Sequence, residues 1–198
     1  MPDPVVSEVP ELVFGDRQRA VRYDPARLCQ IVRSALPDCL SAARWLGGPL
    51  AGLPRIEFSV LGARGMARVH REFLGIPGPT DVITFPYGEV VVCSSVAAAR
   101  CREFGHTVTE ELALYCIHGM LHLAGYDDLR PPDAARMHRA QEQILKRAAA
   151  RLQPTVRARK RGNSGASPKV ARLPGDGLPG SEFRLQAAAC AAMQNSTA

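Results

Sequence analysis

The sequence predicts an α+β fold, a single domain with a small mixed β-sheet packed by about five helices. Two observations support this fold class. The predicted order of elements is helix, strand, helix, strand, strand and then three helices, and no internal repeat is present. A chain of 198 residues with 46% hydrophobic residues is also long enough to bury one core. We assign residues 1–153 to this domain and residues 154–198 to a separate C-terminal tail.

The first predicted helix covers residues 23–36. Asp24 is suited to be its N-cap, a proline follows in the first turn, and apolar residues recur at helical spacing on one face. Pro37 is expected to end this helix, because a proline inside a helix removes a backbone hydrogen bond.

The middle of the chain predicts the sheet. Residues 55–62 alternate apolar and polar side chains, as a half-buried strand does. Residues 63–74 follow as a helix with Phe73 on its apolar side. Residues 81–86 and 89–93 predict two more strands joined by a turn, and the apolar run of the second is typical of a buried strand.

Two further helices flank the most informative segment. Residues 94–105 predict a helix with Ser94 or Ser95 as its cap and Gly105 at its end. Residues 131–152 predict the last helix, which begins at prolines and carries apolar residues on one side.

The predicted helix at 108–124 is apolar nearly all round, which is typical of a buried helix. Residues 107–110 read TVTE, a capping box that fixes its start. His118 and His122 lie four residues apart, so both imidazoles project from one face and could bind one metal ion. Gly119 lies between them and would allow a strand or a substrate to approach closely.

A carboxylate follows the two histidines. Gly125 is suited to end the helix and turn the chain back, which would bring Asp128 to the imidazoles as a third ligand. Asp127 is the rival ligand, and its alternative role is to hold the turn or a histidine N–H. Two histidines and one carboxylate leave a position for water, as in catalytic zinc sites. The alternative is that both histidines are hydrogen-bonded core residues without a metal.

The segment HGMLHLAGYDD resembles the HGxLHLxGYDH signature of the YbeY family of metal-dependent endoribonucleases. GPTDVITFP at 78–86 and GEVVVC at 88–93 are similar to two strands of that family, so the resemblance spans about residues 10–150. It implies an α+β domain with a zinc site at one end of the sheet. It also implies a role in ribosomal RNA processing, especially maturation of the 3′ end of the small-subunit 16S rRNA, and in ribosome quality control.

This chain departs from the family pattern at two places. Asp128 stands where the family usually has a third histidine, which adds negative charge beside a bound water and would also suit iron or manganese. Leu74 stands where the family has an arginine thought to meet RNA. Arg71 is a candidate replacement or a solvated arginine, and Thr80 and Asp81 are expected to shape the substrate groove or merely to form a turn.

The expected function is therefore a zinc-dependent, single-strand-specific endoribonuclease with one Zn²⁺ per chain, although another divalent metal is an open alternative. Its expected reaction is metal-assisted phosphodiester hydrolysis, with no catalytic group identified beyond the metal-bound water. No glutamate follows His118, so the HExxH base of metalloproteases is missing. The alternatives are a non-catalytic, metal-stabilised ribosome-assembly factor and a metallohydrolase of another substrate class.

The distribution of charge indicates which partners the chain can bind. Residues 1–150 contain 17 basic and 17 acidic residues, so the net charge of +6 comes entirely from residues 151–198. This tail is rich in Arg, Gly, Pro and Ser and is predicted to be disordered. The expected partners are ribosomal RNA and the small ribosomal subunit, and no membrane.

The sequence shows no signal peptide and no apolar run of the roughly 18 residues that a membrane span needs, so a cytoplasmic location is expected. The six scattered cysteines are expected to be reduced. Three other histidines are expected outside the metal-binding pair. His70 is a candidate for the border of the site, His106 a loop residue and His138 an exposed residue.

Overall fold

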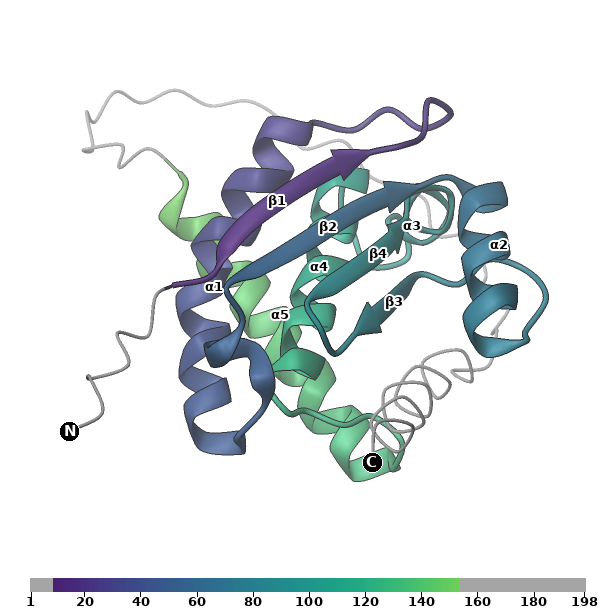
Figure 1. The fold of residues 1–198 in the computed structure, drawn as a ribbon. Coiled ribbons are helices and arrows are strands. Elements are labelled where there is room, and N and C mark those ends of the chain that lie inside the picture. Colours follow the sequence, from purple (N-terminus) through teal and green to yellow (C-terminus); the bar gives the residue numbers. More distant parts are fainter. Residues whose placement is uncertain (1–8, 154–198) are drawn as a thin grey trace, which may run out of the picture.

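The computed structural model describes residues 9–153 and forms an α+β fold of five α-helices and four strands within that range (Figure 1). The elements are β1 (Glu11–Asp16), α1 (Pro25–Leu46), the 3₁₀ turn η1 (Pro49–Gly52), β2 (Arg55–Leu61), α2 (Ala63–Leu74), β3 (Val82–Phe85), β4 (Glu89–Cys93), α3 (Ser94–Arg100), α4 (Val108–Leu123) and α5 (Pro131–Arg151). The predicted tail at 154–198 lies outside the described residues.

The four strands form one mixed sheet in the order β1-β2-β4-β3. Strands β1, β2 and β4 run parallel, and β3 pairs antiparallel with β4 through the short turn between them. The predicted small mixed sheet is confirmed.

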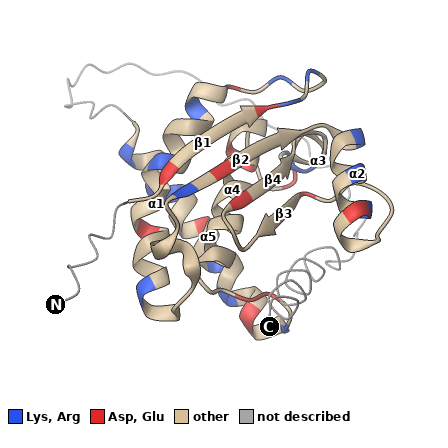
Figure 2. Cartoon of the chain, in the orientation of Figure 1, with Lys and Arg blue, Asp and Glu red and all other residues tan. Residues whose placement is uncertain are grey.

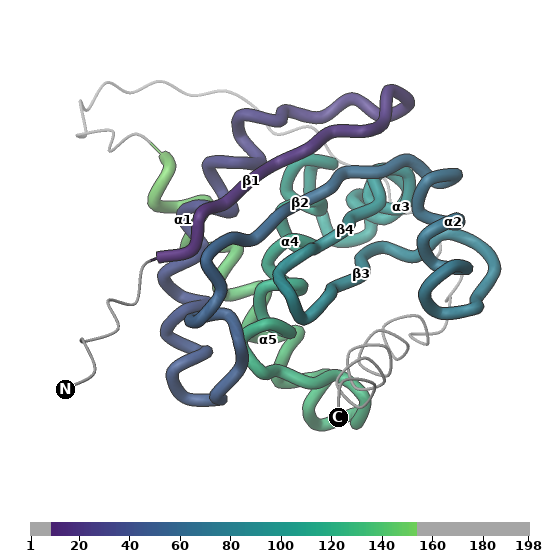
Figure 3. Tube along the Cα trace, in the orientation of Figure 1, coloured from purple at the N-terminus to yellow at the C-terminus, as the bar shows by residue number. Residues whose placement is uncertain are grey.

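Helices cover the two faces of the sheet unequally. Helices α1, α4 and α5 lie on one face and enclose the main core, with α4 between the sheet and the other two helices (Figures 1 and 3). A smaller apolar cluster on the other face packs under α2. Val90 and Val92 of β4 face the main core, whereas Val91 and Cys93 face the smaller cluster. This burial on both faces explains the continuous apolar run of β4.

The expectation that Pro37 ends the first helix is wrong, because α1 continues through Pro37 to Leu46. Pro37 lies on the exposed side of the helix, and the carbonyl that loses its partner belongs to Arg33, which is also exposed. The residues beyond it, including Cys39 and Ala43, remain buried in the main core. Burial of this second half outweighs the cost of the proline, and the helix ends instead at Gly47, whose φ is 74°.

Strand β1 was not predicted. It lies at the edge of the sheet and pairs only with β2, and Leu12 is its one fully buried side chain. Gly15 and Asp16 are poor strand formers, so the segment gives a weak local signal. Its conformation is imposed by the neighbouring strand.

Two local expectations about helices also fail. Helix α3 ends at Arg100, and turns continue to Gly105, because the backbone bonds of that segment close tight turns. Neither Ser94 nor Ser95 caps it: the Ser94 hydroxyl donates to Leu61, and Ser95 accepts the N–H of Ala63 at the start of α2.

Phe73 of α2 is 44% exposed, and its ring meets that of Phe85 in a T-shaped contact. His70 takes the buried place on that side of α2 instead, and its Nδ1 lies 2.9 Å from the carbonyl oxygen of Gly78. His70 thus contacts the loop between α2 and β3.

Within the described residues, the five cysteines are unpaired, as expected for reduced thiols; Cys190 lies outside that range. None of the helices described is both long and apolar enough to cross a bilayer.

Candidate metal centre

Helix α4 carries the two histidines at the centre of the molecule. The predicted capping box is confirmed: the Thr107 hydroxyl oxygen accepts the N–H of Glu110, and the Glu110 carboxylate accepts the N–H of Thr107. The helix is buried nearly all round, so His118 is 1% exposed and His122 is 8% exposed. Burial of this degree requires each imidazole nitrogen to have a partner.

One nitrogen of each ring is held by the protein. His118 Nδ1 lies 2.9 Å from Oε1 of Gln141 on α5, and His122 Nδ1 lies 3.2 Å from the carbonyl oxygen of Tyr126. Both partners accept, so each Nδ1 carries the hydrogen and donates it. In neutral rings this leaves a lone pair on each Nε2, and these two nitrogens face each other at 3.0 Å.

The turn after α4 places the Asp128 carboxylate beside the two histidines. Gly125 has a φ of 100°, and the N–H of Tyr126 donates to the carbonyl of Leu121 as the chain reverses. Asp128 then returns to the histidines, with Oδ2 3.9 Å from Nε2 of both His118 and His122. Asp128 is 1% exposed, and among the residues described neither carboxylate oxygen has a hydrogen-bond partner.

This donor set fits a metal cation. Two lone pairs and a buried carboxylate converge, and the three ligand atoms lie within 4.8 Å of one another. Ligands at about 2.0–2.1 Å around a tetrahedral zinc stand roughly 3.3 Å apart, which lies between the observed separations. A carboxylate buried without a hydrogen bond is costly unless a cation or a proton compensates it. His118, His122 and Asp128 could therefore hold a metal ion.

The pKa values of His122 and Asp128 are both shifted by burial. Burial, together with the neighbouring His118, lowers the pKa of His122 to about 3. Burial, together with the nearby Asp127 and Asp81, raises the pKa of Asp128 to about 6. The imidazole of His122 is thus neutral and able to ligate near neutral pH.

Asp127 is not a member of this group. Its Oδ1 accepts the N–H of Leu129 at 2.9 Å, which is the turn-holding role considered for it. The geometry brings Asp128, and not Asp127, to the two histidines.

Two glycines allow the close packing around the centre. A Cβ on Gly119 would lie 2.5 Å from Cγ1 of Val90, so this glycine admits a strand of the sheet rather than leaving space for substrate. A Cβ on Gly48 would lie 2.2–2.4 Å from backbone atoms of residues 123–125, because the chain before η1 packs directly on the turn after α4. This role of Gly48 could not be predicted from the sequence.

The three residues predicted to meet substrate lie in different surroundings. Asp81 Oδ1 accepts the Thr80 hydroxyl and the N–H of Val82, and Oδ2 lies 3.7 Å from Arg100. These contacts fit the turn role that was considered for Thr80 and Asp81. Arg71 lies exposed on α2, whose outer side carries basic residues (Figure 2), in a shallow hollow that contains no member of the metal group.

Gln141 is the site residue that the sequence reasoning missed. It is a buried polar side chain within the apolar stripe of α5, beside Met137, Ile144 and Leu145. A polar residue within that apolar stripe was the sequence feature that could have identified Gln141. His138, expected to be exposed, is half-buried, because the segment that carries Phe104 lies beside it and the two line one cavity.

Comparisons with known proteins match this chain to one family. A family model described as Endoribonuclease YbeY matches residues 15–149. A protein named Endoribonuclease YbeY from Mycolicibacterium vanbaalenii is 33% identical, over 54% of this chain and 70% of its own length. One of the same name from Thermobifida fusca is 35% identical, over 52% of this chain and 79% of its own length. A solution structure of a protein from Thermotoga maritima is 22% identical with a TM-score of 0.47, and the match covers 75% of this chain and 99% of the other.

Proposed function

This chain belongs to the YbeY family of endoribonucleases, and on that premise we propose that it hydrolyses single-stranded RNA with one divalent metal ion per chain. The observation that carries the proposal is the Asp128 carboxylate, buried without a hydrogen-bond partner among the described residues and 3.9 Å from two histidine nitrogens. A bound cation compensates that carboxylate and uses the two Nε2 lone pairs.

The roles of the residues follow from their contacts. Gln141 fixes the ring of His118, and the carbonyl of Tyr126 fixes the ring of His122, so both present Nε2 toward Asp128. Three protein ligands leave a fourth position open to water or a phosphoryl oxygen. The metal, when bound, supplies Lewis-acid activation of phosphate and lowers the pKa of its water. Gly119 occupies the position of the metalloprotease glutamate, which disfavours peptide hydrolysis.

We propose zinc as the metal, since two imidazoles and one carboxylate make a common catalytic zinc set. Iron and manganese are the competing ions for the same ligands. The proposed substrate is precursor ribosomal RNA, at the 3′ end of the small-subunit 16S rRNA, in the cytoplasm and in association with the small ribosomal subunit. The family name supports an RNA substrate, and the basic composition of residues 154–198 suits contact with phosphate.

The test compares the purified full chain with three variants: His118→Ala, Asp128→Asn and Asp127→Asn. We expect zinc by elemental analysis, and cleavage of a single-stranded RNA that is lost on chelation and restored by zinc. His118→Ala and Asp128→Asn should lose at least roughly 10–100-fold in metal affinity, because each removes a ligand. Asp127→Asn, the matched control, should keep its metal because Asp127 serves the turn.

Other outcomes identify the alternatives. A metal-loaded protein that cuts no RNA but binds the small ribosomal subunit would support an assembly factor. A metal-loaded protein that cuts peptides and not RNA would support a hydrolase of another substrate class.

A further inference from the structure

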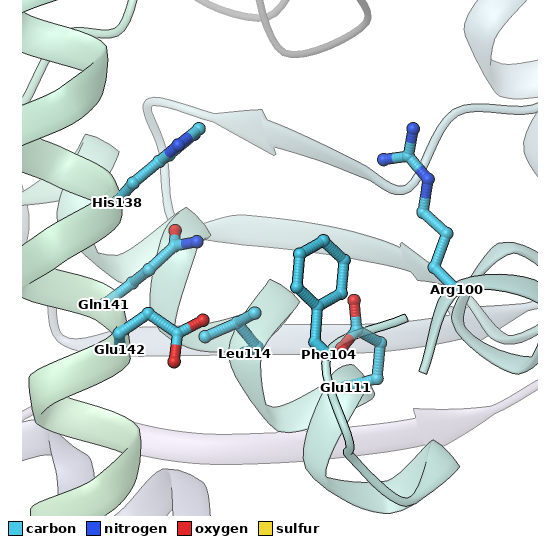
Figure 4. A pocket seen from close by; sticks show the side chains of 7 residues that line it. All are labelled: Arg100, Phe104, Glu111, Leu114, His138, Gln141 and Glu142. Carbon is cyan, nitrogen blue, oxygen red and sulfur yellow. The ribbon is translucent and has the colours of Figure 1, made fainter. Parts of the chain in front are cut away.

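A cavity of about 230 Å³ lies beside the metal group, between the segment after α3 on one side and α5 on the other (Figure 4). Its lining includes Arg100, Phe104, Glu111, Leu114, Gln141 and Glu142. We call it the α3–α5 cavity. Because each water occupies about 30 Å³ in the liquid, a cavity of this size has room for a small planar ring system but not for an oligonucleotide.

The α3–α5 cavity shares a wall with the metal group. Gln141 lines the cavity, and its Oε1 accepts the Nδ1–H of His118 at 2.9 Å. Leu114 lies one helical turn before His118 on α4, a rise of roughly 5–6 Å. A ligand in the cavity therefore lies about one helical turn from the metal ligands, within reach of a nucleotide next to the reacting phosphate.

The lining suits a flat aromatic ligand. Phe104 is a large aromatic side chain that is 60% exposed, and Leu114 adds a second apolar surface. Figure 4 shows Gln141 and Glu142 projecting from α5 toward the side of the cavity where Phe104 stands. Exposed aromatic rings that border a cavity are the usual stacking platforms for unpaired nucleobases.

The charges disfavour a phosphate in the cavity. Its lining holds two carboxylates, Glu111 and Glu142, against one guanidinium, and that guanidinium already lies 3.7 Å from Asp81. Oε2 of Glu111 lies 2.7 Å from Nδ1 of His106, which leaves Glu142 as the carboxylate to meet a ligand. Burial lowers the pKa of His138, so that ring adds no positive charge at neutral pH. A neutral ligand with an N–H donor for Glu142 and an acceptor for the Gln141 amide is the best match.

We propose that the α3–α5 cavity binds one unstacked RNA base next to the cleavage position and prefers adenine, cytosine or guanine over uracil. The first three bases carry an exocyclic amine that can donate to a carboxylate. Uracil has carbonyl oxygens at both exocyclic positions and only the ring N3–H between them as a donor. A carboxylate that meets its exocyclic edge as it would meet the amine therefore faces an acceptor. This proposal rests on the proposed function and adds to it a place and a chemical preference for the substrate.

The experiment measures binding of the full chain to short, uncleavable 2′-O-methyl oligonucleotides of A, C or U by fluorescence anisotropy. We expect the A and C oligomers to bind roughly 5- to 20-fold more tightly than the U oligomer, since a base–carboxylate pair at a half-exposed site gives the low end of the usual discrimination. Glu142→Gln should remove most of this preference, because an amide accepts and donates.

Phe104→Leu should weaken binding of the A and C oligomers by roughly 5- to 20-fold. This is the low end of the affinity loss expected when a base loses its stacking contact with an aromatic ring. Trp45→Leu is the matched control, because Trp45 is an aromatic side chain of α1 that is 87% exposed and takes no part in the cavity. It should leave the preference for A and C over U unchanged. Circular dichroism of each variant verifies that the fold is retained.

The outcomes separate this proposal from the ribonuclease proposal. Equal affinities for the three oligomers, or unchanged binding by both Phe104→Leu and Glu142→Gln, would overturn the base site even if RNA is cleaved. A clear preference that Glu142→Gln removes would support the base site even if no cleavage is found with any metal, in which case the ribonuclease proposal alone fails.

Discussion

Replacing Gly119 with alanine tests how tightly α4 packs on the sheet beside the metal group. An added Cβ would lie 2.5 Å from Cγ1 of Val90 and 3.0 Å from both Cγ2 of Val90 and Oγ1 of Thr84. Val90 is fully buried and β-branched on a central strand, so it has little freedom to move aside.

The expected change combines two opposing terms. Alanine in a helix interior is favoured over glycine by about 1 kcal/mol. Overpacking a well-packed core costs about 1–3 kcal/mol, and a contact this short against a rigid neighbour belongs at the upper end. Gly119→Ala should therefore lower the free energy of unfolding by roughly 2 kcal/mol, and it should weaken metal binding because His118 is the adjacent residue.

The assay is urea denaturation followed by circular dichroism, with Val90→Ala and the double variant completing a cycle. Removing the Val90 methyl groups makes room for the new Cβ, so the two substitutions should be coupled by about 1–3 kcal/mol in the direction that stabilises the double variant. The reasoning is refuted if Gly119→Ala is as stable as the wild type or more stable. It is also refuted if the two single effects add to within about 0.5 kcal/mol.

Three further expectations concern other parts of the chain. Gln141→Leu should reduce zinc affinity by roughly 10–100-fold in a chelator competition, whereas Gln141→Glu keeps an acceptor for His118 and should lose less. Hydrogen bonds from Thr107 lower the pKa of Glu110, so its stabilising effect is present above the unfolded-state value of about 4.3 and is lost as pH falls through the lower folded pKa. The stability advantage of the wild type over Glu110→Gln should thus shrink in acid denaturation curves, and an advantage that grows at low pH would contradict this. Deleting residues 154–198, which carry seven basic and two acidic residues, should flatten the salt dependence of RNA binding, and an unchanged salt slope would show that these residues do not contact phosphate.

Local sequence signals predicted most of the helices and three of the four strands. The capping box at Thr107, the helix at 63–74 and the strand pair at 81–86 and 89–93 are confirmed because each depends on neighbouring residues. Two of the failures have a common cause. Pro37 was expected to end α1, but distant core contacts extend that helix, and β1 was missed because its strand conformation depends on β2.

The sequence by itself determined that His118 and His122 share one helix face, because a spacing of four matches the helical period. It also placed a glycine where the chain must turn, at Gly125. Only the tertiary structure decided that Asp128 joins the two imidazoles while Asp127 accepts the N–H of Leu129, since adjacent residues in a turn point in different directions. The tertiary structure alone brought Gln141 to His118 and formed the α3–α5 cavity between segments far apart in the chain. Periodicity fixes which side chains share a face of one element, whereas the meeting of distant elements is fixed by packing of the whole core.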